Sequence, residues 1–167
     1  MTANERTRTV TWEDPLASLE AAKGLSGLET LRAFLRGELA APPMAALLGF
    51  ALADAGNGFA VFEGMPAEYH YNPLGVVHAG FAMTLLDSAL GCAVFSTLPA
   101  GDGYTTTDTQ VRLIRPITKT TGRVRCEARS VHVGRTTGIA EGQVKDEAGK
   151  ILAIGTSACA IFRATAR

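Results

Sequence analysis

The chain has 167 residues, of which 47% are hydrophobic and 19% are charged. This length is enough for one domain with a real core and short for two, and the composition excludes disorder as the main state. Sixteen basic and sixteen acidic residues cancel. That balance argues against nucleic acid or an anionic membrane as the main partner.

The three cysteines, Cys92, Cys126 and Cys159, are widely spaced and form no CxxC pair. We expect buried free thiols, which are typical of a reducing cytoplasm. No apolar run reaches the ~18 residues that a membrane span needs, and the polar start of the chain is unlike a signal peptide. The sequence therefore predicts a cytoplasmic protein.

The N-terminal part of the chain divides into two predicted segments. Residues 1–14 are polar and mixed in charge, and we expect a flexible tail. Residues 15–45 are expected to form a helical extension, in which Ser26 and Glu29 have the spacing of a capping box. Residues 46–167 are predicted to form the main domain.

Strand patterns surround one long apolar segment in the main domain. Residues 50–63 predict a hairpin that turns at Asn57-Gly58. Residues 79–98 are apolar on nearly every side, which is typical of a helix buried all round. An antiparallel sheet that curls around this helix, an α+β fold, satisfies every element. The remaining strands are predicted over residues 105–114, 123–133, 136–145 and 151–162.

Asp87 is the only Asp, Glu, Lys or Arg between Glu68 and Asp102, and it falls in the middle of the predicted helix. An unpaired carboxylate in a buried helix is strongly destabilising, or it takes up a proton. Two interpretations follow. Asp87 is a core residue bonded to Thr84, Ser88 or a backbone amide, or it is a general base or nucleophile in an apolar wall.

His78 directly precedes the predicted helix, and Ala79 and Gly80 would be its first residues. Backbone N–H groups at a helix start are free and lie at the positive end of the dipole, so they can stabilise a carbonyl oxygen on which charge develops. For the His78 imidazole we favour a capping role. Asn72, in the preceding turn, either donates to a ligand or holds the turn.

Several other chemistries lack their motifs. The chain has no metal-ligand spacing, GxSxG elbow, GxGxxG or P-loop, so we expect no metal and no bound cofactor. Seven of the sixteen basic residues crowd the stretch from Arg112 to Arg135. They form either a solvated sheet face or a patch for phosphate groups, which arginine suits by its fork geometry.

Five motifs follow one another in a fixed order. They are NPLGVVHAG from Asn72, Asp87 nine residues after the histidine, TTD from Thr106, RP from Arg115 and GRT from Gly134. Together they resemble the hotdog-fold acyl-CoA thioesterases of the phenylacetic-acid-degradation (PaaI-like) type. The resemblance implies an antiparallel sheet around a central helix, thioester hydrolysis without a metal, and homodimers or homotetramers.

The resemblance also implies roles for individual residues. Asp87 is the catalytic carboxylate, Asn72 helps to position the thioester or water, and Thr106 helps to orient the nucleophilic water. Ala79 lies where the family uses a backbone N–H to polarise the thioester carbonyl, and His78 opens the helix in the same motif. The family's usual HGG is HAG here, which keeps the N–H but adds a methyl group.

The implied substrate is an acyl-CoA, and one subunit does not suffice to bind and cleave it. Ala79 and Asp87 are about 12 Å apart along a helix that rises 1.5 Å per residue, whereas both must lie ~3 Å from the reacting centre. We therefore expect an antiparallel helix of a second subunit to complete each site. The positions where the family contacts the CoA phosphates are Arg115, Lys119, Gly134 and Arg135.

Two other functions fit the same fold. A non-catalytic acyl-CoA binder is one alternative, although a binder needs no carboxylate at Asp87. A hotdog hydratase or dehydratase is the other, and it ranks last because those enzymes pair a histidine with an acidic residue and the chain has no Asp-x4-His pattern. The fold alone does not decide between these functions.

Overall fold

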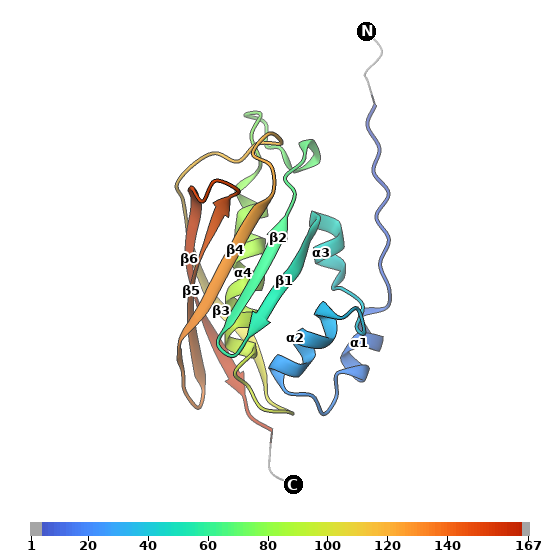
Figure 1. The fold of residues 1–167 in the computed structure, drawn as a ribbon, viewed down its shortest axis with the longest axis vertical. Helices are drawn as coiled ribbons and strands as arrows, with labels where there is room; N and C mark the ends of the chain where they lie inside the picture. The colour runs from blue at the N-terminus through green and yellow to red at the C-terminus, as the bar shows by residue number, and fades with distance from the viewer. Residues whose placement is uncertain (1–4, 165–167) are drawn as a thin grey trace.

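The computed structural model describes residues 5–164 of the chain. Its centre is a six-stranded antiparallel sheet in the order β1-β2-β4-β5-β6-β3, which lies against one long helix, α4 (Figure 1). The predicted α+β fold is therefore confirmed. The strands are β1 (Phe50–Gly56), β2 (Phe59–Gly64), β3 (Gly103–Leu113), β4 (Val124–Val133), β5 (Thr137–Asp146) and β6 (Ile151–Phe162).

Helix α4 (Ala79–Phe95) supplies the centre of the core. Leu85, Leu86 and Leu90 have no exposed surface, and they pack among inward-facing side chains of the sheet. The prediction that this helix is buried all round is nevertheless wrong for the single chain. Met83 is 44% exposed and Asp87 is exposed as well, because α4 packs on the sheet with one side only and this stripe faces away from the core.

The predicted hairpin and helix cap both form. Strands β1 and β2 pair across the Asn57-Gly58 turn, where Gly58 has a positive φ of 80°. At the start of α2 (Gly27–Leu35), the Ser26 hydroxyl accepts from the Glu29 N–H and the Glu29 carboxylate accepts from the Ser26 N–H. These local signals are reliable because neighbouring residues alone satisfy them.

Three short helices cover the β1 edge of the sheet: α1 (Pro15–Ala21), α2 and α3 (Pro43–Leu48) (Figure 1). Helix α2 contacts the end of α4, where Gly27 N–H donates to the Leu98 carbonyl at 3.0 Å. The contact is so close that a Cβ on Gly27 would lie 1.8 Å from the Phe95 oxygen. The opposite edge of the sheet, β3, has no such cover within residues 5–164.

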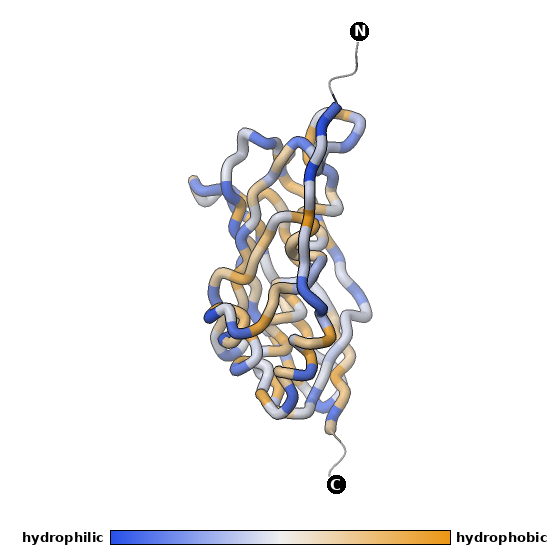
Figure 2. The backbone as a smooth tube through the Cα atoms, turned by 90° about the vertical axis from the view of Figure 1, so that its right-hand side faces the viewer, coloured by the Kyte–Doolittle hydropathy of each residue, from blue (hydrophilic) through white to orange (hydrophobic). Residues whose placement is uncertain are grey.

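Residues 5–14 have neither helix nor strand and run lengthwise along the side with these helices (Figure 2). The Arg8 guanidinium donates to the Ala46 and Leu47 carbonyls at 3.0 and 2.6 Å, and it stacks 3.9 Å above the Tyr69 ring. Tyr69 belongs to a 3₁₀ turn, η1 (Glu68–His70), which leads into the loop before α4. The predicted boundaries after residues 14 and 45 stay predictions.

Candidate active site

Asp87 lies on the exposed stripe of α4, beside strand β3. The Thr106 hydroxyl donates to Asp87 Oδ1 at 3.0 Å, and the Thr109 hydroxyl lies 3.5 Å from the same oxygen. The core interpretation, in which Thr84, Ser88 or a backbone amide satisfies a buried carboxylate, does not hold, because Asp87 is exposed and its hydrogen bonds come from β3. The Thr84 hydroxyl donates to the Gly80 carbonyl instead. The carboxylate therefore faces solvent, with its hydrogen-bonding partners on the edge strand.

An irregularity in β3 brings both threonines to this side. Thr106 pairs with Cys159 and Asp108 pairs with Ala158, so Thr107 is an extra residue in the ladder. In a regular strand, positions 106 and 109 would face opposite sides of the sheet. A bulge shifts that alternation, and our sequence analysis missed Thr109 for this reason, since nothing in the TTTDT run marks which residue bulges.

The start of α4 presents a free backbone donor. His78 is the N-cap, and its Nδ1 accepts from the Gly80 N–H at 2.9 Å. This bond supports the capping role that we favoured for the imidazole. The Ala79 N–H makes no hydrogen bond within residues 5–164. Because it lies at the positive end of the helix dipole, it is suited to hold an anionic or polarised oxygen.

Asn72 holds the loop before α4. Its side-chain Oδ1 accepts from the N–H groups of Leu74 and Val76 at 2.9 and 3.3 Å. Of the two roles left open for Asn72, the structure thus shows the turn-holding one. These bonds use the amide oxygen only, so the Nδ2 group keeps its donors for a ligand.

A cavity of about 260 Å³ lies at the start of α4. It brings together four of the predicted site residues: Asn72, His78, Ala79 and Arg115. Asp87 and Thr106 do not line it. Within one chain, the predicted site therefore consists of two separate groups, one at the helix start and one at mid-helix.

The predicted CoA-phosphate residues are also divided. Lys119 lies near the helix-start group, since its N–H donates to the Tyr71 hydroxyl at 3.1 Å. Gly134 and Arg135 follow the far end of β4, roughly 30 Å from its start at ~3.3 Å per residue. Their carbonyls accept from Arg163 near the C-terminus. One chain does not bring these residues together with Arg115.

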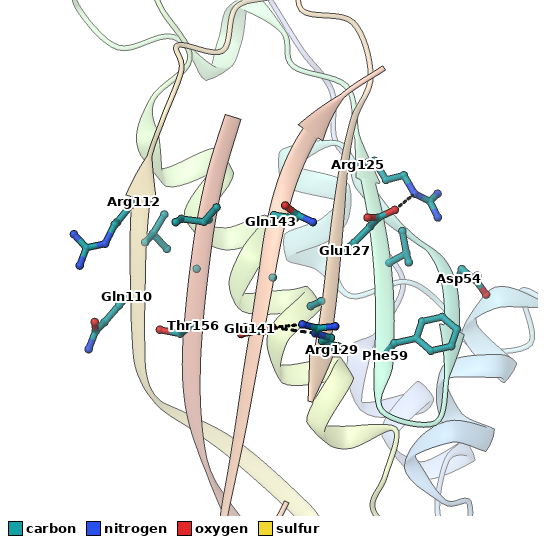
Figure 3. A pocket seen from close by; sticks show the side chains of 16 residues that line it. Asp54, Phe59, Gln110, Arg112, Arg125, Glu127, Arg129, Glu141, Gln143 and Thr156 are labelled. Carbon is teal, nitrogen blue, oxygen red and sulfur yellow. Dashed lines mark hydrogen bonds and ion pairs between the residues drawn. The ribbon is translucent and has the colours of Figure 1, made fainter. Parts of the chain in front are cut away.

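Three other basic residues of the Arg112–Arg135 stretch form ion pairs on the outer sheet face. Figure 3 shows this face, with α4 behind the strands and a broad hollow in front of them. The Arg125 guanidinium contacts Glu63 at 2.8 Å and Glu127 at 3.0 Å. Arg123 pairs with Glu63, and Arg129 pairs with Glu141 at 2.6 Å. For these arginines the solvated-face interpretation is confirmed.

The cysteines are free, as predicted, and they are not activated. Burial raises the pKa of Cys92 to about 12, and it raises the pKa of Cys126 and Cys159 as well. Thiols with raised pKa values are poor nucleophiles near neutral pH. Within the described part of the chain, no cluster of His, Cys, Asp and Glu could hold a metal ion, and no helix is long and apolar enough to cross a membrane.

The comparisons with known proteins agree with this architecture. The thioesterase superfamily model matches residues 74–153, which include α4, β3 and β4. No curated protein matches the chain. Among solved structures, a putative thioesterase described as phenylacetic acid degradation-related, from Ralstonia eutropha, is 26% identical with a TM-score of 0.71. The match covers 78% of this chain and 98% of that one.

Two further solved structures are similar. A mutant of the phenylacetic acid degradation protein PaaI from Thermus thermophilus is 28% identical, with a TM-score of 0.65 over 71% of this chain and 98% of that one. The PaaI protein of Escherichia coli shares the fold at 20% identity, with a TM-score of 0.71 over 84% and 99% of the two chains. These matches confirm the resemblance that the motifs indicated: the chain has the hotdog fold, and it is similar to PaaI-type thioesterases.

Proposed function

We propose that this protein hydrolyses an acyl-CoA or aryl-acyl-CoA thioester to the free acid and CoA. The observation that carries the proposal is the pairing of Asp87 with Thr106 on the open stripe of α4, at 3.0 Å. The thioesterase superfamily match covers the segment in which both residues lie. A structural carboxylate would be expected to pair with a buried donor rather than to face solvent beside a hydroxyl.

The chemistry needs two groups on opposite sides of the thioester. The Ala79 N–H and the helix dipole stabilise the carbonyl oxygen as negative charge develops on it. Asp87 either takes a proton from a water that attacks the carbonyl carbon, or attacks that carbon itself. When water attacks, the C–S bond breaks, the CoA sulfur takes up a proton, and the acid leaves. When Asp87 attacks, breaking the C–S bond leaves a mixed anhydride on Asp87, which water then hydrolyses to release the acid. Thr106 orients the carboxylate and the water.

The two groups meet only if a second subunit contributes one of them. Ala79 and Asp87 belong to one helix but lie about 12 Å apart along its axis. A second α4, antiparallel across a two-fold axis, places Asp87 of one subunit near Ala79 of the other. Residues around this stripe suit such a contact, since Met83, Leu113 and Ile114 are 44%, 51% and 48% exposed.

The sheet edge supports the same assembly. Strand β3 is an eleven-residue strand that, among residues 5–164, has a partner strand on one side only. A long uncovered edge is a template for pairing with another chain. Pairing β3 with β3 of a second copy would keep the two α4 helices side by side. In that dimer, the residues at the far end of β4, Gly134 and Arg135, approach the other subunit's Arg115 and Lys119, and the CoA phosphates bind there.

The test is a kinetic screen of purified protein against short, medium, long and aromatic acyl-CoAs, with release of the CoA thiol as the signal. Turnover with at least one class supports the proposal and identifies the acyl group. Binding of acyl-CoA without turnover would favour the non-catalytic binder. Hydration of an enoyl-CoA without thiol release would favour the hydratase. We expect the active protein in the cytoplasm, as a homodimer or homotetramer.

A further inference from the structure

Residues 5–14 contact the η1 turn, which precedes the loop of the candidate site. The Arg8 guanidinium lies 3.9 Å above the Tyr69 ring, and Arg6 pairs with Glu68 at 2.9 Å. The same Arg8 guanidinium donates to two carbonyls at the end of α3, at 2.6 and 3.0 Å. Because a helix end leaves such carbonyls without partners inside the helix, Arg8 binds firmly there and links α3 to Tyr69.

His70, the last residue of η1, connects this turn to the start of α4. Its backbone carbonyl accepts from the His78 N–H at 2.7 Å. Its ring is buried and lies 4.6 Å from the ring of Phe81, which belongs to the first turn of α4. The ring is also fixed to its own turn, because His70 Nδ1 accepts from the Ala67 N–H at 3.0 Å. A movement of η1 therefore acts on the start of α4 through both the backbone and the ring of His70.

Three consecutive N–H groups at the start of α4 have different partners. The His78 N–H donates to the His70 carbonyl, and the Gly80 N–H donates to His78 Nδ1 at 2.9 Å. The Ala79 N–H, between them, has no acceptor within residues 5–164. Since the Ala79 nitrogen is bonded to the carbonyl carbon of His78, its direction depends on where the His70 carbonyl holds His78.

We propose that Arg8 is a positioning residue, which acts through Tyr69 and His70 to aim the Ala79 N–H at the carbonyl oxygen of the thioester. The inference rests on the proposed function, in which this N–H stabilises that oxygen. An oxyanion donor must lie about 2.7–3.1 Å from the charged oxygen, and a misplacement of about 1 Å can cost ~100-fold in rate. The family match begins at residue 74, so this support for the site comes from outside the matched segment.

The first variant is Arg8→Ala, which removes the stack on Tyr69 and both hydrogen bonds to α3. We expect kcat for thioester hydrolysis to fall about tenfold, because the Ala79 N–H is loosened rather than lost. KM for acyl-CoA should stay within about twofold, since Arg8 contacts neither Arg115 nor Lys119. Hydrogen exchange at the His78 N–H should become about fivefold faster. An unchanged exchange rate in the folded variant would overturn the proposal.

Variants of Tyr69 separate this effect from a loosening of α3. Tyr69→Leu removes the stacked ring and leaves the hydrogen bonds of Arg8 to α3 in place, so it should lower kcat and speed His78 exchange as Arg8→Ala does. Tyr69→Phe keeps the ring and should behave as the wild type. Arg8→Ala/Tyr69→Leu should be no worse than Tyr69→Leu alone, because both residues act through one contact.

Two results of this series would also overturn the proposal. One is a Tyr69→Leu protein with wild-type kcat and His78 exchange, and the other is a double variant whose losses simply multiply. Arg36→Ala is the matched control, because the Arg36 guanidinium pairs with Glu38 at 2.6 Å and has no contact with η1. It should change neither kcat nor His78 exchange. Circular dichroism checks the folding of every variant.

The two readouts distinguish failure of this inference from failure of the proposed function, because hydrogen exchange needs no turnover. If His78 exchange responds to Arg8→Ala but the wild-type protein cleaves no thioester, the positioning of the helix start by Arg8 stands and the thioesterase proposal fails. If thioesters are cleaved but either His78 exchange or kcat is unchanged in Arg8→Ala, the thioesterase proposal stands and the role of Arg8 fails.

Discussion

The two sides of the sheet differ in whether their polar groups have partners of opposite charge. On the outer face most charges form ion pairs, as Arg129 does with Glu141 and Arg125 with Glu127 (Figure 3). Lys145 pairs with Glu127 as well. On the α4 side, Asp87 has no cation, and the Ala79 N–H has no acceptor within residues 5–164. The face with more charges is thus the one on which ion pairs neutralise most of the charges. A carboxylate without a cation and an N–H without an acceptor indicate a candidate site better than a high density of charge does.

The test with the largest expected effect replaces one carboxylate on each side of the sheet. Asp87→Ala removes the base or nucleophile, and we expect kcat for thioester hydrolysis to fall at least ~100-fold. Glu127→Gln is the control on the outer face, and it should leave kcat within about twofold. Thiol release under saturating acyl-CoA measures both variants, and circular dichroism checks their folding. A folded Asp87→Ala protein with near-normal kcat would remove Asp87 from the mechanism.

The second prediction asks whether the unpaired groups belong to different subunits. Ala79→Pro removes the free N–H at the first helical position, where proline is tolerated. The preceding residue, His78, has φ −58° and ψ 140°, a conformation that is compatible with a following proline. Both the Ala79→Pro and the Asp87→Ala homodimers should be inactive, because each lacks one of the two groups in every site.

Mixed dimers of these two variants distinguish shared sites from separate ones. With shared sites, one site carries both lesions and the other carries neither, so co-expressed and differently tagged heterodimers should recover up to about half of the wild-type activity. With sites confined to one chain, every site keeps one lesion. Purified heterodimers no more active than their parents would therefore contradict the shared site.

Local signals in the sequence predicted most of the fold. The Ser26–Glu29 cap and the Asn57-Gly58 turn form as expected because they depend on residues a few positions apart. The long strands after Pro99 followed from period-two alternation. Helix α3 was not predicted individually, because its six residues are too few to show a helical period.

The predictions that failed near the site concern contacts between residues far apart in the sequence, which local sequence patterns do not show. Asp87 was placed in a fully buried helix, yet which stripe of α4 stays uncovered depends on where the sheet ends. Thr109 was missed because a bulge at Thr107 changes the alternation of β3. The basic stretch contains arginines with and without acidic partners. The sequence does not distinguish them, because the acidic partners lie on β2, β4 and β5 and come close only when the strands pair.

The third prediction compares how an arginine near the start of α4 and an arginine on the outer face contribute to CoA binding. CoA or an acyl-CoA at a hundredfold excess over Kd should stabilise the protein by about 2.7 kcal/mol, and salt should weaken the effect. Arg115→Ala should reduce the rise in Tm, whereas Arg129→Ala should keep it, because Arg129 is already paired with Glu141. Thermal melts at low and high salt measure this. No rise in Tm at millimolar CoA or acyl-CoA would count against both the thioesterase and the binder.

The smallest expected effect concerns the outer face itself. Hydrogen bonds from Arg123 and Arg125 lower the pKa of Glu63 in the folded protein. A carboxylate with a lowered pKa contributes stability above its unfolded pKa, near 4.3, and loses that contribution as the pH falls through the folded value. Glu63→Gln should therefore lower the free energy of unfolding at pH 7 by at most about 1 kcal/mol, because the partner arginines are half exposed. Urea unfolding should show this difference shrinking below pH 4 and in high salt. A difference that stays constant with pH would mean that Glu63 acts through packing rather than through its charge.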